Sequence, residues 1–162
     1  MRAAPRVRRA GPADVTRLVV LFRRVREENV PAIPAIVHPP ETVEPLIGRV
    51  VRESTVWLAE AAVEPVAFLA VGDHGEVDHL DVLGDHTGSC LGATLLDLAK
   101  EAHPDGLALG TLAANAGARQ FYARHGFVEV GGTAGDNDEG EPEVGMVWAP
   151  EAPDLGVRME EG

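Results

Sequence analysis

Residues 77 to 127 contain the pattern that most restricts the fold of this chain, because strand and helix signals alternate there within about 50 residues. An apolar segment predicts a strand over 76–83, and a glycine-bearing loop leads from it into a helix with leucines at helical spacing. A second apolar segment predicts a strand over 107–112. A helix over 115–125 follows, and Gly126 closes it. The fold must therefore place a helix after each of two strands.

The flanking segments extend this pattern over most of the chain. A proline-rich loop over 30–40 interrupts the helical signals near the start, and an acidic, glycine-rich loop over 131–143 precedes the end. The sequence predicts these further elements: a strand at 7–10, helices at 12–25 and 43–51, a hairpin of strands at 55–61 and 65–72, and strands at 127–130 and 144–148.

Composition restricts the class of protein. With 162 residues, 45% of them hydrophobic, the chain is long enough for one sizeable core, so we expect a single domain over 1–150 and a mobile tail over 151–162. No apolar run approaches the roughly 20 residues that span a bilayer, and no secretory signal is recognised. The single cysteine fits a reducing compartment. These features predict a cytoplasmic protein with no membrane partner.

The formal net charge of −12 is unevenly distributed. Eight of the fourteen basic residues lie within the first 26 positions, so the remainder is strongly acidic. An acidic surface repels nucleic acid, which predicts no nucleic-acid partner, and it weakly favours a cationic small substrate.

The segment from the strand at 76–83 to Gly126-Phe127, with Asn115 and Tyr122 between, resembles the cofactor half of the GCN5-related N-acetyltransferases (GNAT). The order of elements along the chain is also similar to that family. The resemblance implies an α/β (α+β) fold with a central, mostly antiparallel mixed sheet of about seven strands, a splay between the two central strands, and four flanking helices. It implies transfer of an acetyl or other acyl group from acetyl-CoA to a primary amine in a ternary complex.

The resemblance also implies where the cofactor binds. Unpaired strand amides and a helix N-terminus attract pantetheine and pyrophosphate groups. The implied cofactor-binding residues are Leu80, Asp81, Val82, Thr87, Gly88, Ser89, Cys90, Leu91, Gly92, Ala93, Asn115, Ala118 and Tyr122. The loop departs from the family motif, because Thr87 replaces a Gln or Arg and Cys90 replaces a glycine. A positive φ at Cys90 would cost on the order of 1 kcal/mol.

The acceptor amine must be neutral when it attacks, so a base is needed near the splayed strand. Glu76 and His79 are the predicted bases, although Asp78, Asp81 and Glu60 are also candidates by position. In the family, Tyr122 corresponds to the residue that protonates the leaving thiolate. Two further residues, His38 and Glu60, are predicted to line the acceptor pocket.

Several alternatives remain open at this stage. Asn115 and Tyr122 fit a helix N-cap and a partly buried anchor as well as a functional role. Cys90 lies at a helix N-terminus, where a thiol can become nucleophilic. The Asp and His residues over 73–86 match no compact metal motif, so no metal is predicted. The altered loop also fits a repurposed scaffold, either a ligand-binding module or an enzyme of another class. The acceptor is a small amine or a peptide, and a homodimer is one assembly that the family allows.

Overall fold

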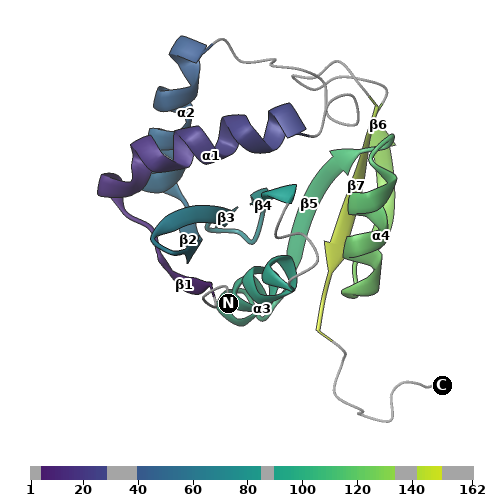
Figure 1. Ribbon diagram of the computed structural model, residues 1–162. Coiled ribbons are helices and arrows are strands. Elements are labelled where there is room, and N and C mark those ends of the chain that lie inside the picture. The colour runs from purple at the N-terminus through teal and green to yellow at the C-terminus, as the bar shows by residue number, and fades with distance from the viewer. Residues whose placement is uncertain (1–4, 29–39, 85–89, 134–141, 151–162) are drawn as a thin grey trace, which may run out of the picture.

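The computed structural model describes residues 5–28, 40–84, 90–133 and 142–150 (Figure 1). The elements, in chain order, are β1 (Arg6–Arg9), a short 3-10 helix η1 (Pro12–Asp14), α1 (Val15–Glu28), α2 (Pro40–Glu53), β2 (Thr55–Ala61), β3 (Glu64–Val71), β4 (Val77–Val82), α3 (Leu91–Ala102), β5 (Leu107–Leu112), α4 (Ala116–Arg124), β6 (Val128–Thr133) and β7 (Glu143–Trp148).

The strands form two antiparallel sheets that meet at one point. The first sheet has the order β1-β2-β3-β4, and the second has the order β5-β7-β6. In the described residues, β4 and β5 are joined only at the parallel bridge between Glu76 and Ala108, where the Ala108 amide donates to the Gly75 carbonyl at 2.9 Å. Beyond this bridge the two strands form no ladder. The predicted mixed sheet with a splay between its central strands is therefore confirmed.

Helices pack on both faces of the first sheet, and α4 packs on one face of the second sheet (Figure 1). Phe22 of α1 contacts His79 of β4, so α1 lies on the His79 side of the first sheet, with α2 packed beside it. The opposite side packs against α3. In the second sheet, Arg119 of α4 binds Glu129 of β6, so α4 covers that face. The core includes residues with almost no exposed surface: Leu18, Ile47, Leu58, Phe68, Leu69, Leu95 and Met146.

Two predicted boundaries were wrong. The second helix begins at Pro40 rather than near Val43, because proline is well tolerated in the first helical turn. Strand β6 continues to Thr133, although the sequence indicated a loop from Gly131 onward. Gly131 pairs with Gly145 of β7, so the neighbouring strand supplies hydrogen-bond partners that outweigh the low strand preference of glycine.

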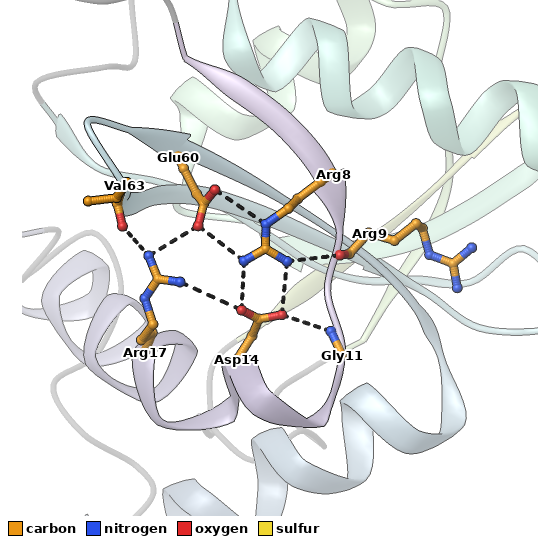
Figure 2. Close-up of polar contacts among 7 residues, drawn as sticks. All are labelled: Arg8, Arg9, Gly11, Asp14, Arg17, Glu60 and Val63. Atoms are coloured by element: carbon orange, nitrogen blue, oxygen red, sulfur yellow. Dashed lines mark hydrogen bonds and ion pairs between the residues drawn. The ribbon is translucent and has the colours of Figure 1, made fainter.

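Figure 2 shows an ion-pair network that joins β1, the entry to α1 and the end of β2. The Arg8 guanidinium donates to both carboxylate oxygens of Asp14, at 2.8 and 3.1 Å, and to both oxygens of Glu60, at 3.1 and 3.3 Å. Arg17 binds Glu60 at 3.1 Å and also donates to the Val63 carbonyl. Asp14 is buried and accepts a further bond from the Gly11 amide. The network fixes the N-terminal strand against the first helix.

We expect Asp14→Asn to lower the free energy of unfolding by about 2 kcal/mol at pH 7, because it removes charge-assisted bonds from Arg8. Hydrogen bonds from Arg8 lower the pKa of the Asp14 carboxyl, with further help from the Gly11 amide, against the opposing effect of burial. The stabilisation is therefore present above the unfolded pKa of about 3.9 and is lost as the pH falls through the lower folded pKa.

Urea denaturation of both proteins at pH 7 and at pH 3 tests this expectation. The exposed Asp97→Asn on α3 is the control, and its unfolding free energy should change by less than about 0.5 kcal/mol. A difference between wild type and Asp14→Asn that stays the same at both pH values would contradict the account.

Candidate active site

The edge of β4 that faces β5 offers backbone groups to a ligand. Along its other edge, β4 pairs with β3 from Ala67↔Val82 to Ala70↔His79. Successive strand residues direct their amide groups to alternate edges, so part of the backbone between His79 and Val82 points toward β5. No ladder with β5 satisfies these groups in the described residues. The predicted backbone site at Leu80, Asp81 and Val82 therefore lies at the opening between the two sheets.

A β-bulge changes the direction of side chains at the start of β4. His79 pairs with Ala70 but Val77 pairs with Val71, which leaves Asp78 as the extra residue. A Cβ atom added at Gly72 would lie 2.8 Å from Glu76 Oε1 and 3.9 Å from Asp78 Oδ2, so both carboxylates approach the same glycine. The bulge interrupts the alternation of side chains along β4, so Asp78 is not held on the face opposite His79.

The bulge groups the candidate bases together. The pKa of the Asp78 carboxyl is raised because nearby protein atoms desolvate it, even though the residue is exposed at the sheet surface. His79 opposes this increase in pKa, and the Glu76 carboxylate adds to it. The His79 ring is half-buried between two phenylalanines, stacked on Phe68 at 5.7 Å and edge-on to Phe22 at 5.8 Å between ring centroids. Glu76, Asp78 and His79 therefore form a cluster of ionisable side chains beside the opening.

Asp81 is buried, and Arg26 of α1 neutralises its charge. Arg26 Nη1 lies 2.8 Å from Asp81 Oδ2, and the guanidinium stacks 3.6 Å from the centroid of the Phe22 ring. Glu28, one half-turn further along α1, accepts a hydrogen bond from the Gly84 amide at 2.8 Å. The last turn of α1 thus holds the end of β4 at two points. Sequence reasoning missed Arg26, whose only signal is its position four residues after Phe22 on the same helical face.

Tyr122 lies on α4, close enough to Asp81 of β4 to be affected by its charge. It is 8% exposed and packs edge-on against Phe121 and Phe127, with ring centroids 5.2 and 5.3 Å away. Burial raises the pKa of the Tyr122 hydroxyl, and the Asp81 carboxylate raises it further. The phenol is therefore protonated at neutral pH. Tyr122, the predicted proton donor, is thus influenced by the charge of Asp81 on β4.

The start of α3 contains one strained residue and one close helix contact. Cys90, the exposed N-cap, has φ 67° and ψ 11°, which is the left-handed conformation that favours glycine. A Cβ atom at Gly92 would lie 3.1 Å from the Phe121 ring, so Gly92 allows α3 to pack closely against α4. Leu91 is buried and Ala93 is half-buried. The predicted loop residues Thr87, Gly88 and Ser89 lie outside the described residues, as does His38.

Asn115 caps α4. Its side-chain oxygen accepts a hydrogen bond from the Ala118 amide at 3.1 Å, which confirms the interpretation of Asn115 as an N-cap. The structure does not bring Glu60 together with these residues, because its carboxylate is bound to Arg8 and Arg17 in the network of Figure 2.

Within the described residues, no helix is long and apolar enough to span a bilayer. Nor do three or more His, Cys, Asp and Glu side chains of these residues converge to hold a metal ion.

We expect Cys90→Gly to raise the free energy of unfolding by about 1 kcal/mol, because glycine adopts the observed φ of 67° without a steric cost. The matched control is Cys90→Ser, which removes the thiol but keeps the β-carbon and should change stability by less than about 0.5 kcal/mol. Urea denaturation measures both variants. An equal gain from serine and glycine would show that the thiol, rather than the backbone conformation, is the source of the strain.

Comparisons with known proteins agree with this geometry. A family model described as "Acetyltransferase (GNAT) domain" matches residues 26–149. No curated protein matches the sequence. Among solved structures, a GCN5-related N-acetyltransferase from Rhodopseudomonas palustris is similar, with a TM-score of 0.74 and 20% identity over 92% of this chain and 98% of that one.

Two further solved structures have the same fold. The paia N-acetyltransferase from Thermoplasma acidophilum, solved in complex with coenzyme A, has a TM-score of 0.69 and 15% identity over 91% of this chain and 99% of that one. The ribosomal-protein-alanine N-acetyltransferase from Brucella melitensis has a TM-score of 0.68 and 20% identity over 89% and 99%. Because the family model covers most of the chain, this protein belongs to the GNAT acetyltransferase family.

Proposed function

We propose that this protein transfers the acetyl group of acetyl-CoA directly to a primary amine of a small molecule or peptide. The observation that carries the proposal is the open edge of β4, which lies opposite β5 and within electrostatic range of the buried Tyr122. An extended thioester arm fits such an edge, because strand amides and carbonyls can pair with it as they would with a neighbouring strand. The coenzyme A complex of the Thermoplasma relative supports the same donor.

The reaction needs three groups of this chain. The neutral amine nitrogen attacks the thioester carbonyl carbon, and the C–N bond forms as the C–S bond breaks. The Leu80 backbone amide donates to the carbonyl oxygen while negative charge develops on it, because the β3–β4 register directs this amide to the free edge of β4 and the Asp81 amide to β3. Tyr122 gives its proton to the departing thiolate, and a base takes the proton that the amine loses. Thiol and amide are the products, so the proton count is balanced.

The base is assigned to the group at the β4 bulge. Glu76 and His79 are the proposed bases, acting directly or through one water molecule. Asp78 joins them because its raised pKa makes it a better proton acceptor at neutral pH than an ordinary aspartate. Asp81 is not assigned this role, because Arg26 neutralises its carboxylate.

The phosphate groups of the donor are proposed to lie at the N-terminus of α3, with the thioester arm along the free edge of β4. Cys90, Leu91, Gly92 and Ala93 supply amides at the N-terminus of α3, where the helix dipole favours phosphate groups. Asn115 is proposed to contact the pantetheine arm through atoms that its capping bond to Ala118 leaves available.

We expect Tyr122→Phe to lower kcat at least 100-fold, because phenylalanine cannot protonate the thiolate. The dissociation constant for acetyl-CoA should change by less than about twofold, because the buried ring and its packing against Phe121 and Phe127 are kept. Stopped-time assays of thiol release with an amine, together with calorimetry, measure the two quantities.

A parallel denaturation curve shows whether the Tyr122→Phe variant is folded. Wild-type turnover in a folded variant would remove Tyr122 from the mechanism. A large loss of donor affinity would assign Tyr122 a role in binding instead.

A further inference from the structure

Among the described helices, none packs on one face of the second sheet. Glu129 pairs with the buried Met146, and Arg119 binds Glu129, so these residues define the face under α4. The opposite face is apolar and in part fully open: Val128 and Val130 are each 62% exposed. Register assigns to it Ala108 and Gly110 on β5, Glu143, Gly145 and Val147 on β7, and Val128 on β6. Val130 of β6 belongs to it as well, because it contacts the side of Gly145 that a Cβ atom would occupy. We call this surface the bare face.

The bare face borders the opening between β4 and β5. Ala108 and Glu76 are partners in the parallel bridge, so their side chains project to the same side of the joined sheets. Glu76 lies with Asp78 over Gly72, in the group to which we assign the catalytic base. A molecule resting on the bare face therefore reaches the proposed base without crossing a strand.

Glu143 is the charged residue of this surface. A Cβ atom at Gly110 would lie 2.9 Å from the Glu143 carboxyl carbon and Oε1, and 3.2 Å from Oε2. The absence of a side chain at position 110 thus lets the carboxylate lie flat against β5 instead of extending into solvent. Within the described residues, the Glu143 side chain is half-buried and forms no hydrogen bond or ion pair. The carboxylate is therefore available to pair with a cation that reaches this surface.

We infer that Glu143 binds a positive charge of the acceptor, and that the acceptor is an aliphatic amine with a second cationic group. The inference rests on the proposed acetyl transfer. The nitrogen that attacks must be neutral, so it cannot be the ammonium that is paired with Glu143. Two nitrogens are therefore needed, one at the base group beside β4 and one over Gly110 on the neighbouring strand. Glu76 is bridged to Ala108, and Gly110 lies two residues further along β5 at about 3.3 Å per residue, so an aliphatic spacer that runs along the bare face joins the two positions.

The test compares 1,5-diaminopentane with 1-aminopentane, which share the reacting amine and the spacer and differ in the second charge. Wild-type protein should use the diamine with a kcat/KM at least about tenfold higher, the effect of one charge-assisted contact. Glu143→Gln should abolish this preference by raising KM for the diamine about tenfold. Its kcat and its turnover of 1-aminopentane should stay within about twofold. Glu129→Gln, on the covered face of the same sheet, is the matched control and should keep the preference.

Calorimetry with the coenzyme A-loaded protein measures the same contact without turnover. The diamine should bind wild type about tenfold more tightly than it binds Glu143→Gln. Equal use of both amines by wild type, equal losses on both amines in Glu143→Gln, or no binding of the diamine would each overturn the inference. Failure of the proposed function has a different signature, since the diamine would then bind in a Glu143-dependent manner while no amine caused thiol release.

Discussion

The interruption of backbone pairing between β4 and β5 is the constraint on which the rest of the structure depends. An unpaired strand edge inside a protein is unfavourable unless water or a ligand satisfies its amides and carbonyls. Here the edge is held open from both sides. The last turn of α1 fixes β4 through the Arg26–Asp81 ion pair and the Glu28–Gly84 hydrogen bond. On the other side, β5 pairs with β7 along its whole length. These contacts therefore maintain the opening, and it does not result from a low strand propensity of β4 or β5.

The same opening explains how charges are arranged around it. Asp81 is buried and neutralised by Arg26, whereas Glu76 and Asp78 lie at the exposed bulge and Glu143 lies over Gly110. The buried carboxylate serves to fix α1. The other carboxylates face the side from which an acceptor would approach. This arrangement separates groups that hold the structure from groups that are available to a cationic substrate.

The sequence predicted the order of the helices and strands, because apolar spacing and the Asn115–Phe127 segment are local signals. It also anticipated the cost of a positive φ at Cys90, which the structure shows. Other features depend on partners distant in the chain. The bulge at Asp78 arises from pairing with β3, and the ion pair of Arg26 joins residues 55 positions apart. Glu143 was expected to end a loop, because its position as the first residue of β7 depends on pairing with Leu112.

The most direct test of the account is a titration of isotope-labelled protein with acetyl-CoA, followed through the backbone amide resonances. Binding in the opening predicts micromolar affinity, with the largest shifts at residues 79–83 of β4 and 90–93 at the start of α3. The amides of β1 and β2, on the far side of the first sheet, should change little. No shifts at millimolar ligand, or shifts confined to β1 and β2, would contradict the claim that the opening between β4 and β5 holds the acyl donor.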